Sequence, residues 1–530
     1  MADFDTLILG GQIIDGTGAP AAEGDLGIKD GRIAAIGSFP PSAAAERVDA
    51  QGMVVCPGFI DMHTHSDIAV LVDGSAHSKV RQGVTLDVIG ESSTVAPLRG
   101  AAAEDYRADA RHRFNYEVEW TDLTGYFRTL EQRGTCINIA SGVSPQQVRR
   151  SVLGYETRPA NDREVAQMQD LTATAMQQGA MGLTCAWHGG GPEHPAEVAA
   201  MARVAARYGG YYGVHLGSEG YEIDEELAKA LYVGREAHIS VHIYHLKVRG
   251  RKNFGRVRAI VQEIEAARAQ GLDITANQYP YTAMQHAWAR LFPRWVQDVP
   301  RREVIPHFAE RDFRDRVKHD PEFVQYIDEH GGWDGIVASV LRNPALKVYE
   351  GKCATDIARM RDLEADPAEA VFDLVLEEGN FPHGVYHNMA EDDVRTVMKL
   401  PWVAIGSDGT ALNDRADGLP HPRSFGTQRV LGKYSRDEGM LPLSEAIRKM
   451  TALPARVLGL KDRGALRIGA WADVVVFDPS VVVDRATFEQ PKQYPSGVEY
   501  VFVNGQLVVA HREHTGARPG RAIYGPGRRS

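Results

Sequence analysis

Three observations predict an α/β protein built around a TIM-like (β/α)8 barrel. Eight apolar strand candidates alternate with helical patterns through the middle of the chain, and this alternation implies parallel strands that close into a barrel. Short strands with glycine turns occupy both ends of the chain. The gap between the seventh and eighth candidates is far longer than a normal crossover. We therefore expect a barrel, a small β-sandwich domain made from both termini, and an insertion between strands 7 and 8.

Both ends of the chain carry hairpin signals. In residues 1–53, Asp30-Gly31 lies between two apolar runs, which is typical of a tight β-turn. Residues 463–530 repeat this pattern, with Asn504-Gly505 after an apolar run. Because neither end alone has enough strands for a hydrophobic core, we expect the two ends to share one β-sandwich rather than form two modules.

The barrel candidates fall in residues 54–283 and 353–462, on either side of the expected insertion. That insertion is residues 284–352, which are rich in Trp, Arg, Glu and Asp. Its place above the C-terminal mouth of the barrel is typical of a lid. The strand candidates are residues 54–62, 84–90, 136–141, 180–185, 211–216, 239–245, 272–279 and 402–408.

The composition indicates in which compartment the protein works and which partners it does not bind. Of 530 residues, 43% are hydrophobic and 24% are charged, which fits a large globular protein. The net charge of −11, without a long basic run, argues against nucleic acid or an anionic membrane as a partner. Four scattered cysteines and the lack of a signal peptide favour the cytoplasm. No apolar run is long enough to span a bilayer. The sequence does not decide whether the protein forms a homo-oligomer.

Two histidines, His63 and His65, follow the first apolar run. Side chains alternate along a strand, so a His-x-His pair places both imidazoles on one side, at the barrel end where active sites are built. Neutral imidazole is the commonest protein ligand for zinc-like metals, which makes the pair a candidate metal motif. Two surface histidines are the simpler interpretation of the pair taken alone.

Three further candidate ligands lie at the ends of other strands. His215 comes at the end of the fifth candidate, His245 at the end of the sixth and Asp408 at the end of the eighth. Each alone is as well explained by a structural role, but parallel barrel strands bring their C-terminal ends to one face. We therefore expect these side chains to hold one or two divalent metal ions, with Zn2+ as the first choice.

Longer motifs resemble one family. The segment from Pro57 to His65, which reads Pro-Gly-Phe-Ile-Asp-Met-His-Thr-His, resembles the first metal motif of the amidohydrolase superfamily. Within that superfamily the chain is similar to the N-acyl-D-amino-acid deacylases (D-aminoacylases) over nearly its whole length. The other segments that carry the resemblance are residues 9–18, 215–220, 245–247, 253–255, 279–283, 389–394, 401–408 and 421–426.

The resemblance implies an anion that bridges two metal ions. Many amidohydrolases use a carbamylated lysine at the end of the fourth strand, but residues 180–185 contain no lysine, which argues against a hydantoinase or a urease. Well-known D-aminoacylases carry a cysteine at the position of Ser92, whereas a related subgroup has a Gly-Glu-Gly-x-Ser-x-Ala-Pro motif that residues 90–97 resemble better. A carboxylate can bridge two cations, so Glu91 is the expected bridge. A solvated loop glutamate is the alternative.

The family resemblance also implies the activity. It implies a metal-dependent amidohydrolase that hydrolyses the amide bond of small N-acyl amino acids, and it leaves open whether these have the D configuration. A metal-bound hydroxide would attack the amide, with Asp408 taking the proton of the water and passing it to the leaving nitrogen. Lys247 and Tyr279 match the family positions that bind the α-carboxylate of the substrate. For Lys247, which has Arg249 and Lys252 nearby, a solvated loop cation is the alternative.

Other functions stay open at this point. Gly217 stands where the family commonly has an arginine, and residues 283–288 are bulkier than their family counterparts. These departures leave open a dipeptidase, or an amidase for another carboxylated amide, including an aromatic one. A deaminase would place a catalytic glutamate beside the fifth-strand histidine, and Glu219 lies four residues after His215. An inactive scaffold protein would have lost metal ligands, whereas this chain keeps a complete set.

Overall fold

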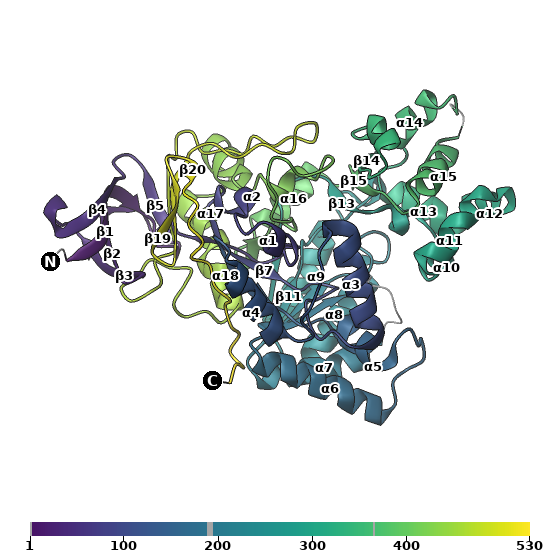
Figure 1. The fold of residues 1–530 in the computed structure, drawn as a ribbon, viewed down its shortest axis with the longest axis horizontal. Coiled ribbons are helices and arrows are strands. Elements are labelled where there is room, and N and C mark those ends of the chain that lie inside the picture. The colour runs from purple at the N-terminus through teal and green to yellow at the C-terminus, as the bar shows by residue number, and fades with distance from the viewer. Residues whose placement is uncertain (1–2, 188–193, 364–365, 530) are drawn as a thin grey trace.

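The structure, a computed structural model, describes residues 3–187, 194–363 and 366–529. Figure 1 shows a β domain at the left that combines both ends of the chain, a barrel in the centre, and an insertion at the upper right. The C-terminal tail returns along the barrel, where Ile139 and Ala522 form a parallel bridge. Within the described residues, no helix is both long and apolar enough to cross a membrane.

The centre of the molecule is a (β/α)8 barrel, as the sequence predicts. Its parallel strands are β6 (Phe59–Asp61), β7 (Val84–Ile89), β8 (Asn138–Ser141), β9 (Gly182–Ala186), β10 (Tyr211–His215), β11 (Val241–Ile243), β12 (Ile274–Gln278) and β16 (Val403–Ile405). They form two hydrogen-bonded groups, β6-β7-β8 and β9-β10-β11-β12-β16. Parallel bridges from Val143 to Leu183 and from Thr64 to Gly409 join the two groups on both sides, so the ring is closed.

Helices follow the strands around the barrel (Figure 1). Polar caps mark the start of two of them: Ser144 caps the helix that begins at Pro145, and Asn161 forms a capping box with Glu164. The helices outside the insertion are α1 (Ala69–Val72), α2 (His77–Val80), α3 (Gly100–Phe114), α4 (Leu123–Arg133), α5 (Pro145–Leu153), α6 (Asp162–Gln177), α7 (Pro195–Arg207), α8 (Ile223–Ala237), α9 (Val257–Ala269), α16 (Glu391–Met398), α17 (Leu443–Met450) and α18 (Ala452–Val457).

Strands from both ends of the chain build one β domain. They are β1 (Phe4–Ile13), β2 (Ala22–Lys29), β3 (Arg32–Gly37), β4 (Ala44–Asp49), β5 (Val54–Pro57), β17 (Val474–Phe477), β18 (Val498–Val503), β19 (Gln506–Ala510) and β20 (Glu513–His514). The sheet order is β20-β19-β18-β17-β5-β1-β2-β3, with β4 paired to β1. Its core mixes residues from both ends, among them Leu26, Val474 and Phe502.

The expected first barrel strand, residues 54–62, is divided at Gly58. Its first half is β5, which pairs with β1 and β17 in the β domain, so only β6 belongs to the barrel. A glycine is needed at this break, because a Cβ there would lie 2.2 Å from Thr85 Oγ1. The amide of Gly58 donates to the carbonyl oxygen of Asp473 at 2.8 Å. The apolar run continues through the break, so the sequence alone hides the change of sheet.

The insertion between β12 and β16 is longer than the predicted residues 284–352. Its strands are β13 (Met284–Ala287), β14 (Ile336–Val340) and β15 (His383–Tyr386), and β15 pairs antiparallel with both others. A separate hydrophobic core contains residues from Met284 to Tyr386. The helices are α10 (Arg294–Gln297), α11 (Arg301–Val304), α12 (Arg311–Lys318), α13 (Pro321–Glu329), α14 (Ala354–Met360) and α15 (Pro367–Glu378).

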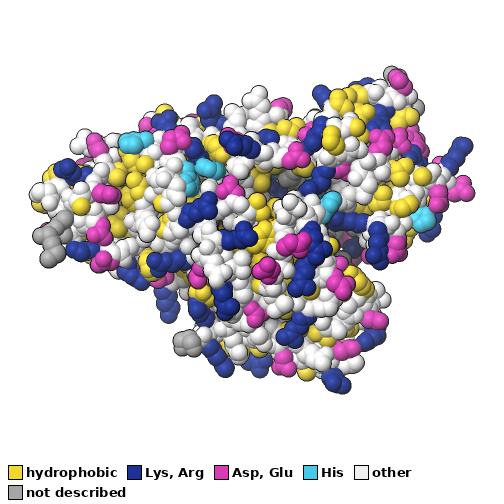
Figure 2. Space-filling view, in the orientation of Figure 1, with side chains coloured by type: hydrophobic (Ala, Val, Ile, Leu, Met, Phe, Trp, Pro, Cys, Tyr) yellow, Lys and Arg dark blue, Asp and Glu magenta, His cyan; other side chains and the backbone are white. Residues whose placement is uncertain are grey.

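Helices α14 and α15, which we expected in the barrel, therefore belong to the insertion. Their apolar faces pack into the core of the insertion, and an apolar helix face does not tell from the sequence which core it covers. Figure 2 shows a notch between the insertion and the lower part of the barrel, with Lys and Arg side chains along its edges.

Candidate metal centre

The six side chains predicted as metal ligands meet at the C-terminal ends of the barrel strands. Their ligand atoms, together with one of Glu219, form three overlapping groups, in each of which the atoms lie within 4.8 Å of one another. The groups are His63, His245 and Asp408; His63, His65 and Glu91; and His215, Glu219 and His245. Because His63 and His245 each belong to two groups, the seven side chains form one continuous cluster.

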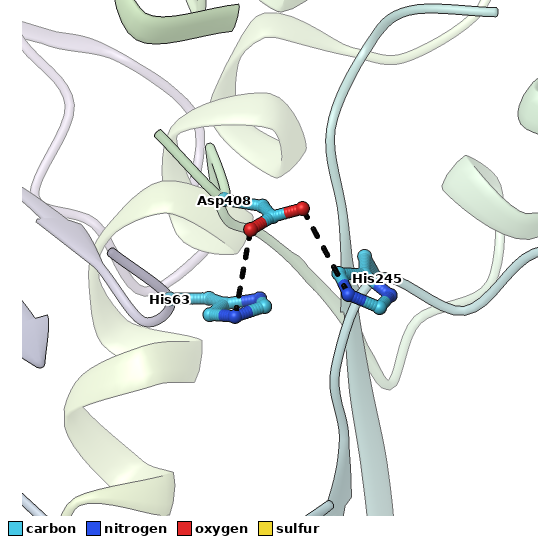
Figure 3. A group of neighbouring side chains, drawn as sticks. All are labelled: His63, His245 and Asp408. Carbon is cyan, nitrogen blue, oxygen red and sulfur yellow. Dashed lines mark ion pairs between the residues drawn. The ribbon is translucent and has the colours of Figure 1, made fainter. Parts of the chain in front are cut away.

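His63 is shared by two of these groups. Its Nε2 lies 3.6 Å from Glu91 Oε2. The same Nε2 lies 3.6 Å from Asp408 Oδ1 (Figure 3). Its ring stacks on Tyr244 with 4.3 Å between the centroids. The side chain is buried, and neither ring nitrogen has a hydrogen-bond partner among the described residues. Buried polar atoms are normally paired, so an imidazole in this state beside two carboxylates fits a metal ligand.

Asp408 is surrounded by cationic and imidazole groups. Its Oδ1 lies 3.0 Å from His65 Nε2, and its Oδ2 lies 2.6 Å from Arg423 Nη1. The same Oδ2 faces His245 Nε2 at 3.8 Å (Figure 3). Burial alone would raise the pKa of Asp408, but Arg423 and the nearby histidines hold it well below its ordinary value. The carboxylate is therefore ionised.

Glu219 orients His245. Its Oε1 lies 2.9 Å from His245 Nδ1, which leaves Nε2 to face the other ligands. His215 meets His245 edge to face with 4.3 Å between the centroids, and its own Nδ1 lies 2.7 Å from the carbonyl oxygen of Leu216. Histidines that bind metal are typically held through their other ring nitrogen in this way. Glu219, considered above as a deaminase acid, contacts a predicted ligand here.

The two residues predicted to bind the substrate lie beside the cluster. Lys247 is buried, and its Nζ lies 2.6 Å from Glu219 Oε1, so it is not a solvated loop cation. Its Nζ lies 5.5 Å from the ring centroid of Tyr279, and the guanidinium carbon of Arg423 lies 4.9 Å from the same centroid. The hydroxyl of Tyr279 donates to Met389 Sδ at 3.6 Å, which is a weak acceptor.

A second buried lysine, Lys79 in α2, supports the backbone of the ligands. Its Nζ donates to Asp61 Oδ2 and Ser407 Oγ, at 2.8 Å each. Asp61 Oδ1 in turn accepts the amide of His63 at 3.3 Å and the amide of Ser407 at 2.8 Å. Since Ser407 precedes Asp408, this network holds the ends of β6 and β16 together.

The two departures from the family pattern have structural explanations. Gly217 leaves room for Glu226, whose Oε2 accepts the amide of Gly217 at 3.0 Å and would lie 2.7 Å from a Cβ at that position. Met284 and Trp288, two of the bulkier residues in 283–288, are buried in the core of the insertion. Their side chains therefore stabilise the insertion and give no support to an aromatic substrate.

Sequence reasoning missed two contacts of this centre. Neither the pairing of Glu219 with Lys247 nor that of Arg423 with Asp408 was predicted. Glu219 and Lys247 lie in loops after different strands, and Arg423 lies 15 residues beyond Asp408 in the long segment after β16. Both Glu219 and Arg423 lie inside segments that carry the family resemblance, residues 215–220 and 421–426. The presence of a charged residue within such a segment was the signal that could have identified Glu219 and Arg423 as residues of this centre.

Known proteins share this architecture. The chain is 34% identical to D-aminoacylase from Alcaligenes xylosoxydans xylosoxydans, over 98% of this chain and 97% of that protein. It belongs to the D-aminoacylase family. A second relative of the chain is the N-acyl-D-glutamate deacylase of the same organism. It is 32% identical to this chain, over 98% of this chain and 96% of that protein. The model of the Amidohydrolase family matches residues 346–509.

Solved structures of the D-aminoacylase family have the same fold. A crystal structure of D-aminoacylase has a TM-score of 0.81 at 32% identity and covers 98% of this chain and 100% of that one. The N-acyl-D-glutamate deacylase of Bordetella bronchiseptica, complexed with zinc and a phosphonate inhibitor that mimics the tetrahedral intermediate, has a TM-score of 0.81 at 30% identity, with coverage of 98% and 100%. The predicted family and fold class are thus confirmed.

Proposed function

We propose that this protein is a zinc-dependent amidohydrolase that hydrolyses the amide bond of N-acyl-D-amino acids. One observation carries the proposal: His63 Nε2, without a hydrogen-bond partner among the described residues, lies 3.6 Å from carboxylate oxygens of both Glu91 and Asp408. The names of two full-length relatives, D-aminoacylase and N-acyl-D-glutamate deacylase, support the substrate class.

We assign the metal ligands to side chains that offer nitrogen or carboxylate oxygen, which suits zinc. Glu91, with two oxygens, is the proposed bridge between two ions. When bound, such an ion lowers the pKa of a coordinated water from about 15.7 toward about 7 and polarises the substrate carbonyl. The proposed ligands are His63, His65, Glu91, His215, His245 and Asp408.

Asp408 is the proposed general base. Its depressed pKa keeps it ionised, so it can take the proton of the attacking water and return it to the leaving nitrogen. The contact of Oδ2 with Arg423 at 2.6 Å holds the carboxylate in one orientation while Oδ1 faces His65 at 3.0 Å. Collapse of the tetrahedral adduct would then release a carboxylate and the free amino acid.

Lys247 and Tyr279 are the proposed site for the α-carboxylate of the substrate. Lys247 and Arg423 both lie against the ring of Tyr279, at 5.5 Å and 4.9 Å. Charge-assisted hydrogen bonds from such cations are among the strongest that a carboxylate can make. The hydroxyl of Tyr279, whose acceptor is a thioether sulfur, is a further donor for this group.

We further propose a cytoplasmic enzyme with a small-molecule substrate and no nucleic-acid or membrane partner. The net charge of −11 supports this choice of partner. All four cysteines are free thiols, which is the usual state in a reducing compartment.

The test compares enantiomers on zinc-loaded protein. Release of free amino acid is measured from N-acetyl-D- and N-acetyl-L-amino acids, with the wild type and with Asp408→Asn. The wild type should hydrolyse the D series. Asp408→Asn should lower kcat by about 10²–10⁴-fold with an unchanged circular dichroism spectrum, because an amide cannot accept the proton.

Asp484→Asn is the matched control. Asp484 is also shielded from solvent and paired with an arginine, Arg429 at 3.1 Å, but it lies outside the three ligand groups. This variant should keep kcat close to that of the wild type. Full activity of metal-free protein, or wild-type turnover by Asp408→Asn, would contradict the proposal.

A further inference from the structure

A buried carboxylate of the insertion contacts two loops beside the metal centre. Glu329, the last residue of α13, is 1% exposed. Its Oε2 accepts Nε and Nη2 of Arg249, at 3.2 and 2.9 Å. Its Oε1 accepts the backbone amide of Tyr221 at 3.1 Å and Nε2 of Gln325 at 3.0 Å. A single side chain of the insertion therefore contacts two barrel loops.

These two loops carry the residues that surround the metal centre on this side. The loop after β10, residues 216–222, contains Glu219, and the loop after β11 contains Lys247 and Arg249. The amide of Arg249 donates to the carbonyl oxygen of Glu219 at 2.8 Å, so the two loops are also joined directly beside Glu329. Lys247, which lies two residues before Arg249 in the sequence, pairs with Glu219 at 2.6 Å.

The local backbone fits this carboxylate closely. A Cβ at Gly220 would lie 2.3–2.6 Å from the carboxylate atoms of Glu329, so the loop approaches the insertion only because this residue is glycine. The carbonyl oxygen of Glu329 accepts Nδ2 of Asn388 at 3.0 Å, and the amide of Gly250 donates to the carbonyl oxygen of Asn388 at 2.9 Å. The contact is thus built on both the side chain and the backbone of Glu329.

We propose that Glu329 is a positioning residue for the active site: it holds the loops after β10 and β11 in the register that pairs Glu219 with Lys247 and with His245 Nδ1. The insertion then acts as a fixed part of the substrate site on this side of the barrel. Loss of the carboxylate leaves Arg249 buried without its anion, and the two loops separate. This inference rests on the proposed function for its kinetic consequence, but its structural consequence can be measured without activity.

The experiment measures chemical labelling of lysines together with kinetics. Reductive methylation of each lysine is followed by mass spectrometry in the wild type, Glu329→Ala and Glu329→Gln, with Lys79 as an internal reference because it is buried and paired elsewhere. In Glu329→Ala, Lys247 should react about tenfold faster or more while Lys79 stays protected, since breaking a buried pair frees the loop locally. KM for an N-acetyl-D-amino acid should rise about tenfold with kcat changed much less.

Two further variants separate positioning from general stability. Glu329→Gln keeps the shape of the side chain and its contact with the amide of Tyr221. Its Lys247 labelling rate and its KM should lie between those of the wild type and those of Glu329→Ala. Glu197→Ala is the matched control, because Glu197 is likewise buried and accepts Arg149 Nε at 3.0 Å and the amide of Ala160 at 2.8 Å. It should lower the melting temperature without a change in Lys247 labelling or KM.

The inference is overturned if Glu329→Ala labels Lys247 no faster than the wild type, or if Lys247 and Lys79 become reactive together. It is also overturned if Glu197→Ala raises KM as much as Glu329→Ala does. Should the wild type hydrolyse no N-acyl amino acid, the proposed function fails, and the labelling of Lys247 still decides the positioning role of Glu329.

Discussion

Two lysines are buried beside the metal centre, and the charges around them differ. Lys79 in α2 meets two carboxylates, Asp61 at 2.8 Å and Asp87 at 3.9 Å. Lys247, in the loop after β11, meets one carboxylate, Glu219 at 2.6 Å. Both side chains are almost fully buried, so neighbouring groups rather than water determine the ionisation of each.

Burial lowers the pKa of both lysines, but the net shifts have opposite signs. At Lys79 the two carboxylates outweigh burial and raise the pKa above its ordinary value. At Lys247 burial outweighs the charges of Glu219 and of Asp408, and Arg423 adds a second positive charge, so the pKa is lowered. Two carboxylates thus face the single charge of Lys79, whereas Lys247 lies near a second cation, Arg423, at the ring of Tyr279. The first pocket suits a structural role and the second suits binding of a carboxylate.

The largest effect is expected at the structural lysine. Lys79→Met leaves Asp61 and Asp87 buried without a cation, so the free energy of unfolding should fall by about 3–5 kcal/mol. Urea denaturation followed by circular dichroism measures this change. Lys449→Met is the control, because Lys449 is equally buried but donates to the carbonyl oxygens of Leu400 and Val403 and has one carboxylate, Glu445 at 3.7 Å. Equal losses in the two variants would mean that the excess of carboxylates at Lys79 is unimportant.

A smaller effect, of a different kind, is expected at Lys247, the lysine proposed to bind the substrate. Lys247→Met should raise KM for N-acyl-D-amino acids by roughly 10–100-fold, since a charge-assisted contact of about 1.5–3 kcal/mol is lost. The free energy of unfolding should fall less than in Lys79→Met, because Glu219 keeps His245 Nδ1 as a partner at 2.9 Å. An amide without a carboxylate is the control substrate, and its KM should hardly change. Equal losses on both substrates would make Lys247 a structural residue like Lys79.

The smallest effect is expected at Tyr279. Tyr279→Phe removes a hydroxyl whose proton goes to a weak acceptor, the thioether of Met389, so the melting temperature should change little. KM should rise by about 2–12-fold, which corresponds to one hydrogen bond of about 0.5–1.5 kcal/mol. Tyr281→Phe is the matched control, because that hydroxyl donates to Asp484 Oδ2 at 3.0 Å and should affect stability rather than KM. A reversed pattern would place the carboxylate site elsewhere.

Much of the fold was predictable because barrel strands are short apolar runs with polar residues at their ends. The exceptions are the break at Gly58 and the end of the insertion, at residue 386 rather than 352. In both cases the pattern of apolar residues is unchanged across the boundary, and only the pairing partner differs. Strand pairing is a contact between distant parts of the chain, so a local pattern does not report it.

The candidate site was partly predictable because most of its residues stand at the ends of apolar barrel strands. His63, His65, His215, His245 and Asp408 stand at strand ends, and the strand-end rule places all of them on one face. Glu91 was chosen through the family resemblance. The pairs Glu219–Lys247 and Arg423–Asp408 were missed because their members lie 28 and 15 residues apart in loops without a period.

The sequence by itself determined the family, the order of strands and helices, and which side chains stand at the C-terminal ends of the barrel strands. These features follow from local patterns and motifs, which are present in the amino-acid sequence whether or not the chain is folded. The tertiary structure alone decided how charge is shared among buried groups: that Lys79 meets two carboxylates, that Lys247 meets one, and that Glu329 of the insertion joins the loops that carry Glu219 and Lys247. Ionisation in a buried site depends on distances of a few ångströms between residues far apart in the chain, and only the folded chain sets those distances.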